Sequence, residues 1–281
     1  MKVSSLLKKI VMITGDLPTL PQTGQIVMQK LSDPEVDIKE LEKIIMRDPS
    51  LTSRILKIAN SPFYGRPRTI KTISEATVVI GLSTLKSIVI ASALREMLKN
   101  FGLTEKLLWE HALATAFITR YLAEKLCYRN IEEAFLAGLL HDIGKIVLQL
   151  RVPDRMYLVM QDVYHGENTN SIEVEMEVFG FTHAHVGQLV ARKWQFAVEI
   201  EETIGYHHWP GRASVDPMLA HLTHLANIFS HKMEVGPIRT PDVELSETVS
   251  AKYLKLSDEQ VNDYFQECTS KIQSEKEGLL S

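Results

Sequence analysis

The most informative stretch of this chain is AFLAGLLHDIGK, residues 134–145. Its first seven residues are apolar on every helical face, which is typical of a helix buried at the centre of a domain. We therefore predict a central helix over residues 131–142. Because this helix ends in the adjacent polar pair His141 and Asp142, a histidine and a carboxylate are expected to lie inside the protein.

Histidines also fall on the inward faces of the helices predicted on either side of this stretch. An N-cap threonine, Thr182, indicates where one of these helices begins. The histidines, with the helix that each is predicted to occupy, are His111 (104–126), His183 (from 183 onward), and His207 and His208 (198–208). The pattern predicts that several helices converge through their histidines.

The inward-facing groups form a candidate metal site. An unpartnered imidazole or carboxylate is costly to bury, so such groups need partners or a cation. Imidazole nitrogens and a carboxylate suit divalent zinc, iron or manganese, and the adjacent His141 and Asp142 can each serve one of two neighbouring ions. The alternative is a polar core network in which the imidazoles bond to one another and to water. The candidate ligands are His111, His141, Asp142, His183, His207 and His208.

Short helices are predicted throughout the first third of the chain. Asp37 and the Asp48-Pro49 pair are typical helix N-termini, and the junction at residues 81–83 separates two further helices. This junction imitates a helix-turn-helix, but only Lys86 and Arg95 are basic in the second helix, which favours packing over contact with nucleic acid.

The whole chain is predicted to be all-α, because no stretch shows sustained period-two alternation and no internal repeat of 20 to 50 residues is evident. We expect an N-terminal helical lobe over residues 1–102, a helical core over 103–236 and a C-terminal helical tail over 237–281 that is charged and peripheral. The first residues are interpreted as an amphipathic helix. SIEVEMEVFG, residues 171–180, is interpreted as a helix with a solvated acidic face.

Composition narrows the cellular setting and the partners. A formal net charge of −4 provides no global attraction to nucleic acid or to anionic lipid. The only two cysteines, Cys127 and Cys268, do not resemble a disulfide framework, and a reducing cytoplasm fits best. The one membrane-span candidate, residues 76–94, is interrupted by polar residues. We therefore expect a cytoplasmic protein that binds neither nucleic acid nor membrane.

Two groups of motifs resemble known families. LLHDIGK, residues 139–145, resembles the signature of the HD metal-dependent phosphohydrolases, with His111 upstream and further histidines downstream in the expected order. LPTLP (17–21), IIMRDPSLTSRILKIANSPFYG (44–65) and TISEATVVIGLSTLKSIVI (72–90) resemble the HDOD family, an offshoot of the HD proteins. The resemblance covers roughly residues 17–230 and implies an HD-like helical core with an additional N-terminal lobe.

The resemblance also implies roles for individual residues. In the binuclear HD enzymes, positions similar to His111, His141 and Asp142 hold one metal, and positions similar to His183, His207 and His208 serve the second. Asp142 would bridge the two ions. Lys145 would meet a substrate phosphate, although a lysine near a helix end more often complements the helix dipole. If the chain is an enzyme, Asp142 and Lys145 are the candidate catalytic residues.

This chain departs from the enzymes at two points. HD enzymes carry a final aspartate on the last core helix, where this chain has Asn227, as the HDOD pattern does. A neutral amide is a poorer ligand than a carboxylate, so at least one metal position is expected to be weakened. The glycine-tyrosine-proline signature of cyclic di-GMP phosphodiesterases is absent after His208, which disfavours hydrolysis of cyclic di-GMP.

The remaining histidines are excluded from the predicted ligand set. Surface or supporting roles are expected for His185, His221, His224 and His231, and His165 is expected to be solvated. Of these, His224 precedes Asn227 by one helical turn and could substitute as a ligand. The loop SPFYGRP, residues 61–67, is compatible with a binding loop or with simple turn chemistry.

Three functions remain open at this point. The leading hypothesis is a regulatory signal-transduction module that binds a protein partner or a small phosphorylated ligand and keeps a degenerate metal site, with one or two iron, manganese or zinc ions. The alternative is a metal-dependent phosphohydrolase acting on a nucleotide or another phosphoester. A third possibility is a scaffold whose histidine cluster only stiffens the core.

Overall fold

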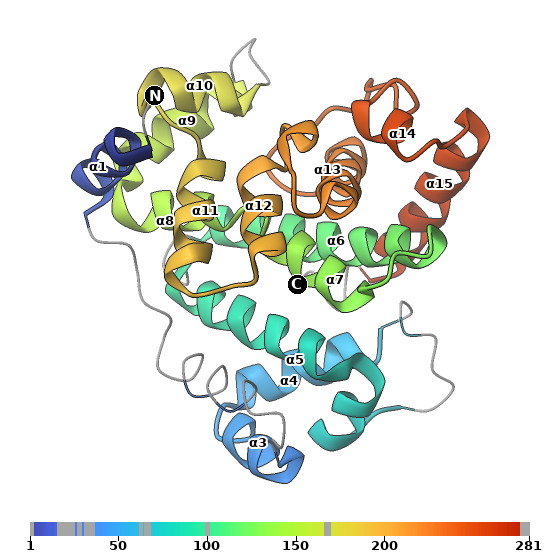
Figure 1. Ribbon diagram of the computed structural model, residues 1–281. Helices are drawn as coiled ribbons and strands as arrows, with labels where there is room; N and C mark the ends of the chain where they lie inside the picture. Colours follow the sequence, from blue (N-terminus) through green and yellow to red (C-terminus); the bar gives the residue numbers. More distant parts are fainter. Residues whose placement is uncertain are drawn as a thin grey trace.

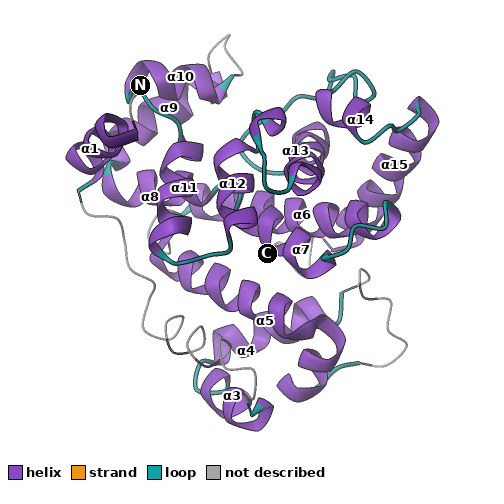
Figure 2. Cartoon of the chain, viewed as in Figure 1, coloured by secondary structure: helices purple, strands orange, loops and turns teal. Residues whose placement is uncertain are grey.

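The computed structural model describes residues 3–15, 26, 30, 37–61, 64, 69–98, 102–165 and 170–275. Within these ranges the chain forms helices and connecting loops and no strand, as Figure 2 shows. The all-α prediction is confirmed. LPTLP and most of SPFYGRP lie outside the described residues.

The described helices follow one another in this order along the chain. In order they are α1 (Val3–Thr14), α3 (Ile38–Ile45), α4 (Pro49–Ala59), α5 (Ile73–Leu98), α6 (Leu103–Lys125), α7 (Ile131–Leu140), α8 (Ile143–Arg151), α9 (Pro153–His165), α10 (Ser171–Val178), α11 (His183–Lys193), α12 (Val198–Tyr206), the 3₁₀ turn η2 (Pro210–Arg212), α13 (Pro217–Lys232), α14 (Val249–Tyr253) and α15 (Asp258–Glu275).

Helices α6 and α7 lie at the centre and contribute to two apolar clusters. One cluster joins them to α3, α4 and α5, and the other joins them to α8 and to α11 through α15. Figure 1 shows α5 running along one side of this central pair, with α3 and α4 beyond it. The apolar stretch predicted to be central is buried throughout: every residue from Ala134 to Leu140 is buried. This arrangement carries the end of α7 to the middle of the molecule.

Local sequence signals start the N-terminal helices where they were expected. The Asp37 carboxylate accepts from the backbone N–H of Lys39 at 2.8 Å, and the Asp48 carboxylate accepts from that of Leu51 at 3.0 Å. These caps satisfy backbone donors that have no partner within the helix.

The predicted junction between two helices at residues 81–83 is a kink inside α5. Gly81 has φ of +80°, a conformation that favours glycine, and the helix resumes beyond it. Glu132, from the first turn of α7, accepts from the backbone N–H of Thr84 at 3.1 Å and from the Thr84 hydroxyl. A carboxylate of the central pair therefore caps the second half of α5.

The charged C-terminal segment is less peripheral than its sequence suggests. Helix α14 packs on α13 and α15 packs on α6. Ala251, Val261 and Cys268 are fully buried within the apolar cluster of the core. The expectation of a peripheral tail is wrong for these residues, because apolar side chains spaced at helical intervals among the charges provide a packing face.

Within the described ranges, each helix is too short or too polar to cross a bilayer.

Helices α8 and α11 approach so closely that a glycine is required between them. A Cβ at Gly144 would lie 2.7 Å from the carbonyl carbon of His183 and 2.9 Å from the backbone nitrogen of Gly187, both of which belong to rigid helix backbone. This close approach holds the two helices that carry Asp142 and His183 against each other.

We predict that Gly144→Ala lowers the free energy of unfolding by about 1–3 kcal/mol, because the added methyl group overpacks the α8–α11 contact. The thermal unfolding midpoint should fall by about 2–4 °C per kcal/mol. Gly211→Ala is the matched control, since a Cβ at Gly211 meets nothing within 4 Å. Equal midpoints for the two variants would contradict the prediction.

Candidate functional site

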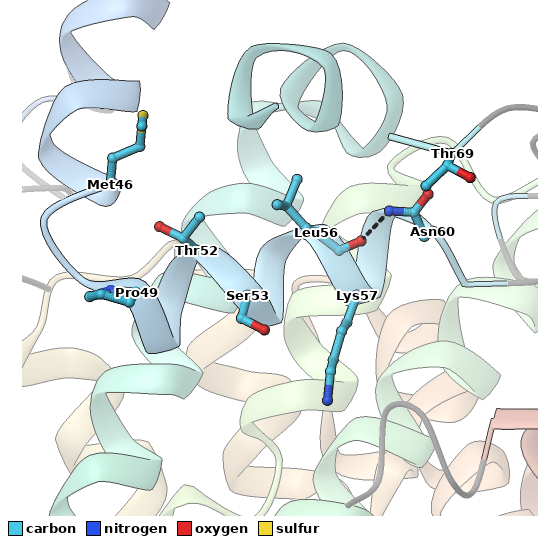
Figure 3. A pocket seen from close by; sticks show the side chains of 8 residues that line it. All are labelled: Met46, Pro49, Thr52, Ser53, Leu56, Lys57, Asn60 and Thr69. Atoms are coloured by element: carbon cyan, nitrogen blue, oxygen red, sulfur yellow. Dashed lines mark hydrogen bonds between the residues drawn. The ribbon is translucent and has the colours of Figure 1, made fainter. Parts of the chain in front are cut away.

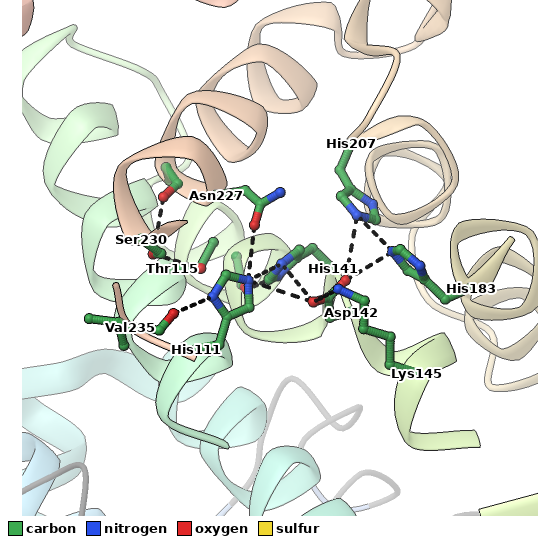
Figure 4. A network of polar contacts seen from close by, with 12 residues as sticks. His111, Thr115, His141, Asp142, Lys145, His183, His207, Asn227, Ser230 and Val235 are labelled. Atoms are coloured by element: carbon green, nitrogen blue, oxygen red, sulfur yellow. Dashed lines mark hydrogen bonds and ion pairs between the residues drawn. The ribbon is translucent and has the colours of Figure 1, made fainter. Parts of the chain in front are cut away.

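Five helices bring polar side chains to one buried cluster at the end of α7. His141 and Asp142 stand at the junction of α7 and α8, and Figure 4 shows His111, Asn227, His183 and His207 pointing toward them from four other directions. Asp142 has 5% of its surface exposed, and His141, His183 and His207 have none. The sequence prediction named all of these residues, and the fold brings them together.

The first half of the cluster contains His111, His141 and one oxygen of Asp142. The Nε2 atoms of His111 and His141 are 3.2 Å apart. Oδ2 of Asp142 lies 3.6 Å from Nε2 of His111 and 3.5 Å from Nε2 of His141. All three ligand atoms therefore face a common point.

The second half contains His183, His207, His208 and the other oxygen of Asp142. Nε2 of His183 lies 3.0 Å from Oδ1 of Asp142, 3.3 Å from Nε2 of His207 and 3.1 Å from Nε2 of His208. Oδ1 nevertheless makes no well-aligned hydrogen bond with any described residue. The two oxygens of Asp142 thus face two different sets of imidazoles.

The opposite ring nitrogens determine which tautomer these histidines adopt. Nδ1 of three rings faces a backbone carbonyl oxygen, and Nδ1 of His183 faces the carboxylate of Glu175 at 2.8 Å. Because these oxygens can only accept, Nδ1 carries a proton in all four rings. The carbonyl pairs are His111 with Val235 (3.1 Å), His141 with Gly138 (2.7 Å) and His207 with Ile204 (2.8 Å).

The cluster consequently presents lone pairs to lone pairs. With Nδ1 protonated, Nε2 of the neutral His111 and His141 rings can only accept, yet these two atoms face each other and Oδ2 of Asp142. Two nitrogens bound to one ion at about 2.1 Å would be about 3.0–3.4 Å apart, which matches the 3.1–3.3 Å separations between Nε2 atoms. Within each half, the candidate ligand atoms all lie within 4.8 Å of one another. The residues therefore fit one or two divalent metal ions, and the buried cluster could bind them.

Burial sets the charge of most of these groups. It lowers the pKa of His111 to about 4 and holds the pKa values of His141 and His208 well below their usual range, with neighbouring imidazoles adding to the effect. Burial raises the pKa of Asp142, but the positive charge of Lys145 and the nearby imidazoles outweigh it and hold that pKa well below its usual range. The carboxylate is therefore ionised and the rings of His111, His141 and His208 are neutral at neutral pH.

His183 differs because it lies between two carboxylates. Burial lowers the pKa of His183, but the negative charges of Glu175 and Asp142 outweigh that effect, so the pKa is raised above its usual value. A proton and a metal ion would therefore compete for Nε2 of His183.

Lys145 is buried and pairs with Asp142. Its ammonium donates to Oδ2 at 2.7 Å, and 3% of the residue is exposed. The interpretation of Lys145 as a solvated helix-end lysine is wrong, because α8 turns it inward to the one carboxylate that it can neutralise.

Asn227 lies beside the first half, where it could add a fourth ligand to His111, His141 and Asp142. Its Oδ1 lies 2.9 Å from Nε2 of His111. An amide oxygen can serve as a neutral ligand, weaker than a carboxylate toward a divalent cation.

Glu175 belongs to the site and was missed by the sequence prediction. It is fully buried, and its carboxylate accepts from the backbone N–H of His183 at 2.7 Å and from Nδ1 of the same residue. The prediction that 171–180 presents a solvated acidic face holds for the exposed Glu173 and Glu177 but is wrong for Glu175. The spacing of Glu175 with Ser171 and Val174, both buried, could have shown that it lies on the inward stripe.

The excluded histidines have other partners. Nδ1 of His185 accepts from the backbone N–H of Thr182 at 3.1 Å and thereby caps the start of α11.

Two other histidines, His221 and His231, are buried, so a surface role is wrong for both. His231 stacks on His111 with ring centroids 4.9 Å apart. His224 bonds to Ser250 rather than to a metal-ligand group. The side chain of His165 lies outside the described residues.

A second hollow, on the N-terminal lobe, has a different character. It is a groove of about 600 Å³ beside α4, drawn in Figure 3, and among the described residues Lys57 is the one charged side chain that lines it. Asn60 closes one end and donates to the carbonyl oxygen of Leu56 at 2.7 Å. The groove shares no residue with the histidine cluster.

We predict that Glu175→Gln weakens metal binding by about 10–100-fold, because the variant loses the charged acceptor that orients and polarises His183. The measurement is a competition titration of Mn²⁺ or Zn²⁺ against a chromophoric chelator. Glu177→Gln, an exposed substitution on the same helix, should bind metal like the unaltered protein. Identical affinities for the two variants would contradict the role given to Glu175.

Comparisons with known proteins agree with this fold. At 25% identity over 194 residues, the chain is similar to an uncharacterized protein of Treponema pallidum (strain Nichols), and the match covers 69% of this chain and 38% of that protein. The chain thus spans less than two fifths of the length of that relative.

Two solved structures have a similar fold. An HDOD domain protein of unknown function from Geobacter sulfurreducens has a TM-score of 0.81 at 24% identity, covering 98% of this chain and 97% of that one. A protein from Shewanella amazonensis SB2B, provisionally named a metal-dependent phosphohydrolase, has a TM-score of 0.70 at 21% identity, covering 96% of each chain. At these identities the likeness concerns the fold alone.

The resemblance first seen in the N-terminal motifs is confirmed by a family comparison. The model of the HDOD domain matches residues 17–210, more than half of the chain. The chain belongs to the HDOD domain family.

Proposed function

We propose that this protein is a regulatory signal-transduction module that binds a divalent transition metal, iron, manganese or zinc, at its buried histidine cluster. The observation that carries the proposal is the convergence of four imidazole Nε2 atoms on the two oxygens of Asp142. A protein partner or a small phosphorylated ligand would be the signal that it receives or transmits. The regulatory role, the partner and a cytoplasmic setting are parts of this proposal.

A regulatory role is favoured over efficient catalysis by the composition of the site. The final ligand position holds the neutral Asn227, which weakens the first half of the cluster. When bound, a divalent metal supplies a positive charge that can attract a phosphate oxygen. Lys145 keeps Asp142 ionised and correctly turned, and the Nδ1 contacts keep the rings aligned.

We predict that metal stoichiometry follows the division of the cluster into two halves. Asp142→Ala should lose all bound metal, because its oxygens face both halves, whereas His111→Ala and His208→Ala should each remove no more than one equivalent. The measurement is elemental analysis of protein purified without chelators or a metal-affinity tag, with thermal unfolding to show that each variant is folded. Full metal content in folded Asp142→Ala would refute the proposed centre.

A second candidate function is a metal-dependent phosphohydrolase. It is favoured by Asp142, whose two oxygens face separate sets of ligands, and by Lys145, whose ammonium lies 2.7 Å from Oδ2 of that residue. A buried lysine beside the cluster could contact a substrate phosphate if Asp142 turned to a metal.

Asn227→Asp distinguishes the two functions. We predict that it raises metal affinity at the His111 half by roughly tenfold, about 1.4 kcal/mol, because a carboxylate replaces an amide. In the regulatory module, both proteins should turn over bis(p-nitrophenyl) phosphate far more slowly than about 1 s⁻¹ in Mn²⁺. Turnover at or above that rate by the unaltered protein would favour the enzyme, and unchanged metal affinity would contradict the weakened-ligand interpretation.

A further inference from the structure

A small cavity adjoins the histidine cluster. It has a volume of about 260 Å³ and lies between the start of α10, one side of α13 and the loop at residues 238–240. His208 and Asn227 belong both to the cluster and to the cavity wall. A ligand in this cavity would therefore lie directly beside the candidate metal ions.

The remaining wall combines apolar surface with uncharged hydrogen-bonding groups. Three isoleucines, Ile172, Ile228 and Ile238, line it, and so do Asn170, Ser171, His224, His231 and Thr240. Among the described residues, none that lines it is lysine, arginine, aspartate or glutamate. Burial lowers the pKa of His224 to about 4, so that ring is neutral at neutral pH. The described part of the wall therefore offers a ligand hydrogen bonds and apolar contact rather than an ion pair.

Two imidazoles in this wall retain unused hydrogen-bonding capacity. His231 is 8% exposed, and its Nε2 is buried without a partner among the described residues. His224 uses Nδ1 for Ser250, 2.8 Å away, and no described residue bonds to its Nε2. A buried polar nitrogen left unpaired in a cavity wall, here that of His231, indicates that a polar ligand satisfies it.

The tautomer of His224 is coupled to helix α14 through Ser250. The Ser250 hydroxyl is fully buried and lies 2.9 Å from Nδ1 of His221 and 2.8 Å from Nδ1 of His224. Because a hydroxyl has one proton, it can donate to only one ring and must accept from the other. His221 stacks on Tyr253 with ring centroids 3.8 Å apart, which fixes its plane.

Two proton arrangements follow from this geometry. When Ser250 donates to His224, Nε2 of His224 carries a proton and is a donor toward the cavity. When Ser250 donates to His221 instead, Nδ1 of His224 carries the proton and Nε2 is an acceptor. The relay therefore lets one side chain match either a donor or an acceptor on a ligand.

We propose that this cavity binds the uncharged heterocycle of a small phosphomonoester, such as a nucleobase, with His224 as a ligand-contacting residue whose tautomer Ser250 and His221 set. The phosphoryl group would lie at the metal cluster, so the inference rests on the proposed function. The flat apolar faces of a heterocycle would pack against the isoleucines. Its edge, which combines hydrogen-bond donors and acceptors, would bond to the imidazole and amide groups.

Size and position support this class of ligand. Sites for drug-sized ligands typically have volumes of about 300–1,000 Å³. This cavity is smaller, which favours one heterocycle over a dinucleotide. Its wall shares His208 and Asn227 with the cluster, so a ring bound in the cavity would lie beside a phosphoryl group at the metal ions.

The test measures binding of inorganic phosphate and of the 5′-monophosphates of adenosine, guanosine, cytidine and uridine to Mn²⁺-loaded protein by calorimetry. At least one monophosphate should bind about tenfold or more tightly than phosphate. His224→Ala should abolish that preference and Ser250→Ala should reduce it by about threefold, while phosphate affinity stays the same. Ser274→Ala, an exposed serine on α15, is the control and should behave like the unaltered protein.

Metal content and thermal unfolding are measured on the same samples. Unaltered protein that takes up no metal would overturn the proposed function, whereas metal-loaded protein that binds every monophosphate no more tightly than phosphate would overturn this inference alone. Retention of the preference by folded His224→Ala would also overturn it. If His224→Ala fails to fold, an undiminished preference in folded Ser250→Ala overturns the tautomer relay.

Discussion

The structure depends on keeping one buried carboxylate, that of Asp142, compensated on every side. An ionised group removed from water is very unfavourable unless charges or a metal surround it, and breaking a buried pair typically costs about 3–5 kcal/mol. Lys145 supplies the charge at 2.7 Å, and imidazoles from three other parts of the chain approach both oxygens. The α7–α8 junction, the contact between α8 and α11 and the inward turn of Lys145 all serve this one group.

The same packing prepares the imidazoles for a cation. Four of the five rings, those of His111, His141, His183 and His207, are held on the outer side by a carbonyl or by Glu175, so their inner nitrogens are presented in one orientation. This resembles the supporting hydrogen bonds found around metal-ligating histidines, which fix ring orientation and raise basicity. Rigid positioning explains how a site with a neutral amide at one ligand position can keep a metal-binding geometry.

The cluster and the cavity beside it are built mainly from different parts of the chain. The six candidate ligands lie within the stretch that matches the HDOD family, whereas Asn227 and two histidines of the cavity wall, His224 and His231, lie beyond it. The shared residues His208 and Asn227 would connect the two.

The sequence by itself determined the all-α architecture, since capping residues and apolar spacing act within a few residues of one another. It also identified the six candidate ligands, because the order of histidines around His141 and Asp142 can be read along the chain. Only the tertiary structure decided that Glu175 is buried against His183, that Lys145 turns inward, and that Ser250 joins His221 to His224. These contacts link residues on different helices, and the physical reason is that a side chain's partner is set by how helices pack, which local periodicity does not specify.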